Sequence, residues 1–256
     1  MTIAARTIAT NAAATKAPMN FMRKNSLVAG AFYLLTFVSI PTLALYTSVR
    51  APNFIVGPGP DTSVFVGAIL EVIVALAGIG TAIALYPVVK RQNEGVALGF
   101  IGARVLEASA LFVGVACLLS VVTLRQAAAG AGALVIGQAL VAMYDRIFLL
   151  GGSLMPAVNA LLLGSLLYRS RLVPRAIPLL GLIGAPLLIG ADVAVLFDLI
   201  GRTSTPAVLT ALPIALWELS LGIWLVVKGF RPSPILFTDT PDAGVRGSIA
   251  SAAADR

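Results

Sequence analysis

The chain has 256 residues, of which 59% are apolar, and it carries only 18 basic and 11 acidic side chains. Its mean hydropathy is +0.97. Because about a quarter of the residues in an ordinary soluble domain are charged, this composition excludes most soluble folds and predicts a membrane protein with several spans.

Six stretches are apolar and long enough to cross about 30 Å of hydrocarbon. We expect spans over about residues 26–49, 63–89, 95–124, 147–168, 176–200 and 206–227. Residues 1–25 contain no acidic residue and predict a flexible basic tail near anionic lipid headgroups, although their Arg, Thr and Ala content also resembles an organelle transit peptide. Residues 232–256 predict a disordered tail. The predicted fold is an all-α transmembrane bundle of six helices over residues 26–231.

Another uncharged stretch, between Arg125 and Asp145, raises the alternative of a seventh span. With six spans and the N-terminus inside, 13 basic residues fall on the inner side and four on the outer side, as the positive-inside rule requires. A seventh span would move Arg169, Arg171 and Arg175 outside. We therefore expect residues 126–146 to form an outer interfacial helix or an outward extension of the fourth span, with both termini in the cytoplasm.

The residues that are missing exclude several kinds of site. The chain has no histidine, which excludes histidine-ligated haem, histidine zinc sites and histidine-dependent triads. The single cysteine, Cys117, permits neither a disulfide nor a cysteine metal cluster within one chain. We identify no catalytic residue, expect no cofactor, and leave the question of a metal open. The net charge of +7 comes from Lys and Arg at the span ends, so we expect no nucleic-acid partner.

Several polar side chains lie inside the expected spans, where an ionised group costs at least about 2.5 to 3.5 kcal/mol. Arg104 and Glu107 are three residues apart on one helix and can pair. Four acids at depth face this one arginine, so some of them are protonated or a cation lies among them. The predicted ligand- or ion-binding site comprises Glu71, Arg104, Glu107, Asn159, Asp192 and Glu218. A network that only fixes helix register is the alternative.

Two further patterns bear on a cavity. Pro41, Pro156, Pro186 and Pro213 interrupt four spans, which is typical of helices that bend either around a cavity or for packing. Glu107 and Glu218 each precede a serine by two positions. This weak internal repeat would fit the inverted three-plus-three symmetry of many transporters.

Four motifs recur in an order that resembles a known family. They are Val28-Ala29-Gly30-Ala31-Phe32-Tyr33-Leu34-Leu35-Thr36, Ala103-Arg104-Val105-Leu106-Glu107-Ala108, Leu166-Leu167-Tyr168-Arg169-Ser170 with Leu172-Val173-Pro174-Arg175, and Trp217-Glu218-Leu219-Ser220 with Leu225-Val226-Val227-Lys228-Gly229. Over about residues 22–231 the chain resembles the bacterial membrane family catalogued as domain of unknown function 4386. The resemblance implies a bacterial inner-membrane protein with six helices and brings no established activity. Members often have a histidine near the start of the fourth helix, where this chain has Asp145 and Arg146.

These observations favour a proton- or cation-coupled transporter, or a small-solute binder, in the bacterial plasma membrane, with the lipid bilayer as its surroundings. A structural or regulatory membrane subunit and a membrane-embedded enzyme are the alternatives. Tyr144-Asp145 and Gly190-Ala191-Asp192 are similar to the paired aspartates of intramembrane proteases. Asp145 falls at the outer span boundary, however, and the second motif lacks its first glycine, so the pattern speaks against such a protease. The sequence carries no signal for an oligomeric state.

Overall fold

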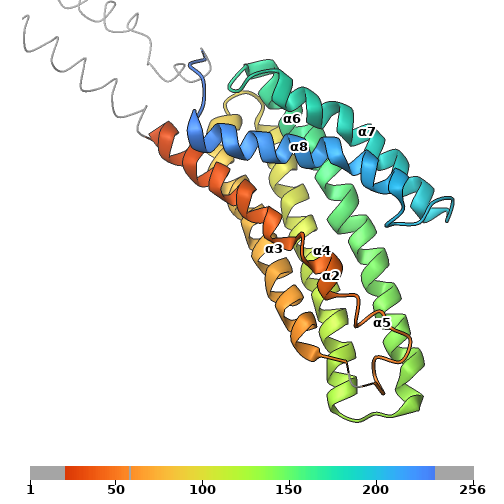
Figure 1. Ribbon diagram of the computed structural model, residues 1–256. Helices are drawn as coiled ribbons and strands as arrows, with labels where there is room; N and C mark the ends of the chain where they lie inside the picture. The colour runs from red at the N-terminus through yellow and green to blue at the C-terminus, as the bar shows by residue number, and fades with distance from the viewer. Residues whose placement is uncertain (1–20, 58, 234–256) are drawn as a thin grey trace, which may run out of the picture.

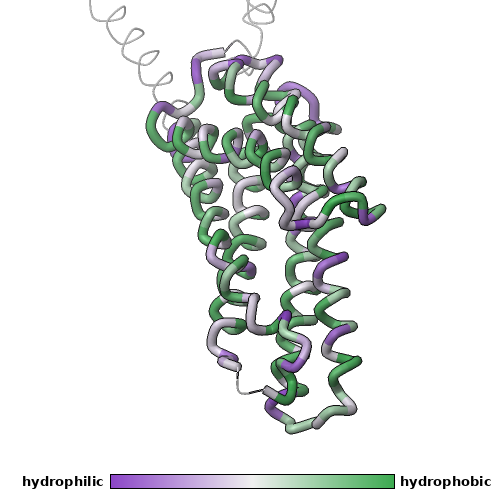
Figure 2. The backbone as a smooth tube through the Cα atoms, turned by 45° about the vertical axis from the view of Figure 1, so that its right-hand side comes forward, coloured by the Kyte–Doolittle hydropathy of each residue, from purple (hydrophilic) through white to green (hydrophobic). Residues whose placement is uncertain are grey.

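The computed structural model describes residues 21–57 and 59–233, and within these residues the regular elements are all helices. Six helices are long and apolar enough to cross a membrane: Phe21–Leu45, Asp61–Val89, Glu94–Gln126, Ala131–Ser170, Ala176–Leu196 and Thr205–Val227. Apolar residues follow these helices along most of their length (Figure 2). The expected all-α bundle with six spans is therefore confirmed.

The helices form an elongated bundle in which α3 (Asp61–Val89), α4 (Glu94–Gln126) and α5 (Leu134–Ile147) run side by side (Figure 1). Helices α7 (Ala176–Leu196) and α8 (Thr205–Val227) pack against each other and cross the rest of the bundle obliquely. The end that holds residues 21 and 233 is called the terminal end here, and the end with the turn between α4 and α5 is called the far end. The start of the first helix, the α3–α4 connection, the segment before α7 and the end of α8 lie at the terminal end (Figure 1). These segments carry the basic residues Arg23, Lys24, Lys90, Arg91, Arg169, Arg171, Arg175, Lys228 and Arg231.

The first span is broken in its second half. A regular helix over residues 21–35 changes into the 3₁₀ turn η1 (Thr36–Ser39), and the short α2 (Thr42–Leu45) follows Pro41. Proline has no N–H, so the carbonyls before it lose helical partners. Hydroxyl groups replace some of these bonds, because Thr36, Ser39 and Thr42 each donate to the carbonyl three residues earlier, at 2.7, 3.1 and 2.7 Å. The carbonyl groups of Tyr33, Thr36 and Ser39 thereby accept hydrogen bonds although the α-helix is interrupted.

Helices α3 and α4 form a long antiparallel hairpin that is fixed at both ends. At the terminal end the Asn93 side chain accepts a hydrogen bond from the Val96 N–H at 3.0 Å and caps α4. At the far end Arg125 contacts Asp61 at 2.7 Å. With 33 residues, α4 is about 50 Å long at 1.5 Å per residue, which exceeds the hydrocarbon thickness of a bilayer.

The fourth span is a single long helix with one widened turn. The 3₁₀ turn η2 (Ala131–Ala133), α5, the π-helical segment η3 (Phe148–Ser153) and α6 (Leu154–Ser170) follow one another without interruption. Pro156 lies just after the π segment and lacks the N–H that would bind the Gly152 carbonyl, which explains a widened turn there. Most of the stretch 126–146 thus extends the fourth span, the second of the two arrangements expected for it.

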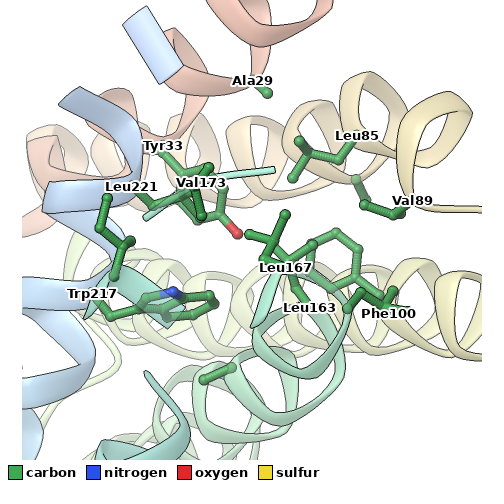
Figure 3. Close-up of a cluster of buried hydrophobic side chains, with 14 of the residues drawn as sticks. Ala29, Tyr33, Leu85, Val89, Phe100, Leu163, Leu167, Val173, Trp217 and Leu221 are labelled. Carbon is green, nitrogen blue, oxygen red and sulfur yellow. The ribbon is translucent and has the colours of Figure 1, made fainter. Parts of the chain in front are cut away.

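The largest cluster of buried apolar side chains joins the first helix to α3, α4, α6, α7 and α8 (Figure 3). Side chains from six helices meet there, including the fully buried Tyr33, Phe100, Leu163 and Trp217. The rings of Tyr33 and Trp217 pack edge to face with centroids 6.3 Å apart. Arg23 donates to the carbonyls of Leu225 and Val226 at 3.2 and 2.7 Å. A side chain of the first helix therefore caps the C-terminal end of α8.

The two expected tails fall mostly outside this description. Residues 1–20 and 234–256 lie outside the described residues. Residues 21–25, expected at the end of the first tail, already belong to the first helix. Ser233 donates a hydrogen bond to the Ser170 carbonyl at 3.1 Å, so the start of the second expected tail is held against α6.

Substituting Gly30 with valine is expected to destabilise the bundle. A Cβ atom at Gly30 would lie 2.7 Å from the carbonyl oxygen of Gly222, so the first helix and α8 could not keep their distance. Overpacking of this kind costs about 1–3 kcal/mol, and thermal unfolding in detergent should show it. Gly102→Val is the matched control, since a Cβ there meets no atom within 4 Å. Equal losses of thermal stability in the two variants would contradict the close contact.

Candidate functional site

A buried charge network lies between α4, α6 and α8. The Nη1 of Arg104 contacts Glu107 Oε2 at 3.0 Å within α4, as their three-residue spacing predicts. The Nη2 of the same guanidinium contacts Glu218 Oε1 of α8 at 2.9 Å. Asn159 of α6 donates from Nδ2 to Glu107 Oε2 at 2.7 Å. Four of the six predicted site residues thus belong to one network, in which Arg104 contacts Glu107 and Glu218 and Asn159 binds Glu107.

The network carries more negative than positive charge. Glu107 and Glu218 bring two carboxyl groups to the single guanidinium of Arg104, whose side chain is 2% exposed. The Oδ1 atom of Asn159 is buried and has no hydrogen-bond partner among the described residues. With both carboxyl groups ionised, one negative charge is left over, and an acceptor oxygen lies next to it. The arrangement can therefore hold a proton or a small cation.

Aromatic rings enclose the guanidinium on its other sides. The Arg104 Cζ atom lies 5.3 Å from the ring centre of Tyr33 and 5.7 Å from that of Phe100. Such rings attract a cation through their faces and exclude water from it. Low polarity strengthens the pairing of Arg104 with its two acids. Tyr33 was not among the predicted site residues, because nothing in an uncharged stretch indicates which ring will face a distant arginine.

A cavity of about 320 Å³ opens beside this network. Arg104, Glu107 and Glu218 form its charged part. Both irregular helix segments contribute to its wall: Thr36 and Ser39 come from the broken first span, and Phe148, Gly152 and Ser153 come from the π segment of the fourth. Helices α4 and α8 do not pack closely against each other, so Arg104 and Glu218 bridge the space between them.

Asp192 is linked to this cavity through one serine. The Ser153 hydroxyl, which lines the cavity, donates to Asp192 Oδ1 at 2.7 Å. The other oxygen, Oδ2, is buried without a partner among the described residues. Asp192 therefore lies one hydrogen bond away from the cavity and has no contact with Arg104. Its serine partner is the third residue of a Gly-Gly-Ser sequence, and that pattern alone did not indicate a site.

Glu71 lies in a different part of the bundle. It is 2% exposed, and its Oε1 accepts a hydrogen bond from the Tyr144 hydroxyl of α5 at 2.6 Å. The predicted meeting of all four acids at Arg104 is therefore not what the structure shows. The sequence gives the position of Glu71 along its span. It does not show on which side of α3 the Glu71 side chain lies.

Comparison with known proteins is informative at the level of the family. The family model described as Domain of unknown function (DUF4386) matches residues 28–229, which include the whole charge network. The chain belongs to this family. No curated protein and no solved structure matches the chain. The resemblance drawn from the sequence motifs is thus confirmed, and the function has to be argued from the site.

Replacing Arg104 with glutamine is expected to destabilise the protein strongly, because Glu107 and Glu218 would stay buried without their cation. Breaking a buried pair of this kind costs about 3–5 kcal/mol. Chemical denaturation in detergent, followed by circular dichroism, measures the loss. The double variant Arg104→Gln/Glu218→Gln should recover part of it.

Arg146→Gln is the control for this prediction. Arg146 and Asp198 are 3.8 Å apart with side chains 55% and 83% exposed, and pairs of this kind contribute little to stability. If Arg104→Gln destabilises no more than Arg146→Gln, the buried network does not hold the bundle together.

Proposed function

We propose that the protein is a membrane carrier or small-solute binder in which the cavity beside Arg104 takes up a proton or a cation together with its solute. One observation carries the proposal: a charge network with an unbalanced carboxyl group lines an open cavity between spans. A network that served only to fix helix register would be expected to pack without a cavity. The cavity therefore favours binding over a purely structural role.

The charge balance supports coupling to a cation. Protonation of Glu218 would remove one of the two negative charges beside Arg104 and weaken the bridge between α4 and α8. Since α4 and α8 contact each other little elsewhere, the state of this one carboxyl group would bias how far they separate. Asp192, reached through Ser153, is a second group that could hold a proton at the same cavity.

The irregular helices support movement at the same place. Broken spans that line a cavity are common in secondary transporters, where unwound backbone contacts the solute. π segments also occur often at functional sites. Here η1 and η3 both line the cavity of Arg104, although they come from the first and fourth spans. Two discontinuities at one cavity are expected of a carrier.

The membrane and the orientation complete the proposal. We place the chain in the bacterial plasma membrane, with the terminal end in the cytoplasm. The nine basic residues at that end support this orientation under the positive-inside rule. The four arginines that the sequence predicts for the outer side each lie within 4 Å of an acid: Arg50 and Arg202 contact Asp145, Arg125 contacts Asp61, and Arg146 contacts Asp198.

Proton flux into reconstituted vesicles tests transport directly. With the membrane potential clamped and a pH-sensitive dye inside, the wild-type protein is expected to dissipate a proton gradient. Glu218→Gln should slow the flux at least about tenfold, which corresponds to about 1.4 kcal/mol in the barrier. Asp198→Asn, a change at an exposed carboxylate, should leave the flux unchanged. If neither wild type nor Glu218→Gln gives a measurable flux with any ion tested, transport is refuted.

Tryptophan fluorescence tests the proton site without a known solute. The chain has two tryptophans, so Trp224→Phe leaves Trp217 as the only one. Trp217 packs against Tyr33, whose ring in turn lies against Arg104. As the pH is lowered, proton uptake by the network should change the Trp217 emission. Glu218→Gln, which removes one carboxyl group from the network, should alter this response, and Asp198→Asn should retain it. The same response in all three proteins would refute a proton site in the network.

A further inference from the structure

A second cavity, of about 330 Å³, lies toward the far end of the bundle. We call it the arginine vestibule. Its wall comes from the end of the first span, from the junction of α5 and η3, and from the α7–α8 connection. The residues that line it are Thr42, Leu43, Tyr46, Arg50, Tyr144, Asp145, Phe148, Arg202 and Thr203. None of the six residues predicted from the sequence as a site is among them.

The lining of the arginine vestibule carries an excess of positive charge. Arg50 Nη1 contacts Asp145 Oδ2 at 2.7 Å, and Arg202 Nη1 contacts Asp145 Oδ1 at 3.3 Å. Two guanidinium groups therefore share one carboxylate, and among the described residues Asp145 is the only acid that lines this cavity. Each guanidinium has five N–H donors, so one aspartate satisfies only part of them.

Aromatic faces hold both guanidinium groups in place. The Arg50 Cζ atom lies 5.5 Å from the ring centre of Tyr144, and the Arg202 Cζ atom lies 4.9 Å from that of Phe148. Glu71 lies behind this wall, since it is bound to the Tyr144 hydroxyl and does not line the vestibule. Stacked, oriented arginines are well suited to bind the oxygens of carboxylates and phosphates in pairs.

We propose that the arginine vestibule binds an oxyanion, a carboxylate or phosphate group, between Arg50 and Arg202. The hydroxyl groups of Tyr46 and Thr203 supply further donors around it. In the absence of the ligand, Asp145 occupies the two guanidinium groups as an internal competitor. This binding does not depend on whether the cavity of Arg104 transports anything.

Thermal unfolding of the full-length protein in a neutral detergent tests the proposal, with sodium phosphate and sodium acetate compared against sodium chloride at equal ionic strength. Wild type should be stabilised saturably by phosphate or acetate beyond the effect of chloride. Arg202→Gln should weaken the apparent affinity at least about tenfold. Asp145→Asn should strengthen it, because it frees both guanidinium groups. A variant that misfolds cannot bind more tightly, so this rise is not an artefact of damage.

Arg146→Gln is the matched control, because Arg146 is adjacent to Asp145 in the chain, pairs with Asp198 and does not line the vestibule. Its affinity for phosphate should equal that of wild type. A loss in Arg146→Gln as large as that in Arg202→Gln would overturn the assignment, because it would reduce the effect to general surface charge.

The source of the oxyanion is distinguished by a second pair of probes, short-chain phosphatidic acid and short-chain phosphatidylcholine. Leu43 lines the vestibule and is 69% exposed, so a lipid tail could lie beside it. If phosphatidic acid binds and inorganic phosphate does not, and if the affinity again rises in Asp145→Asn and falls in Arg202→Gln, the site is supported and its ligand is a lipid headgroup. Binding of both supports a free solute. If neither phosphate, acetate nor phosphatidic acid stabilises wild type beyond its control, the proposal is refuted.

Discussion

The guanidinium of Arg104 lies among apolar helices and is held there by one carboxylate from its own helix and one from α8. An unpaired charge in this position would cost several kcal/mol, so the pairing constrains the whole bundle. It fixes the rotation of α4, because Arg104 and Glu107 have to face the same neighbours. It also fixes the position of α8, which reaches α4 mainly through Glu218. The cavity exists because this contact is made by long side chains across a space.

The two cavities differ in the sign of their charge. The cavity of Arg104 has two carboxyl groups for one guanidinium, and the arginine vestibule has two guanidinium groups for one carboxylate. Phe148 lines both and lies on the π segment of the fourth span. A solute with both a cationic and an anionic end, or a proton that accompanies an anion, would meet complementary charge in each. The two environments therefore share one aromatic residue, which lies on the π-helical turn of the fourth span.

The sequence predicted those features that depend on residues close together in the chain. Apolar stretches of sufficient length predict six spans, and the spacing of Arg104 and Glu107 predicts their contact. Contacts between distant helices depend on how each helix is rotated, and residues such as Glu71 and Glu218 differ in this respect although both are acids at depth. A uniformly apolar helix has no polar face that would reveal its rotation. For this reason the pairing of Glu218 with Arg104 and the separate position of Glu71 became visible only in three dimensions.

The π segment was similarly hidden. Its residues, Phe148–Ser153, are apolar or small and carry no charge. Pro156 indicated that the helix is disturbed, but a kink, a break and a widened turn all follow from the same missing N–H. The position of Phe148 beside both cavities could therefore not be predicted from the sequence.

The first helix of this chain packs against α8, the last one. Arg23 binds the carbonyls at the end of α8, and Gly30 lies against Gly222. During synthesis about 200 residues separate the two, so the first span waits on the order of ten seconds or more for its neighbour to emerge from the ribosome. Throughout that interval Arg104 has Glu107 beside it and lacks Glu218. Completion of the buried charge network is therefore among the final events of assembly.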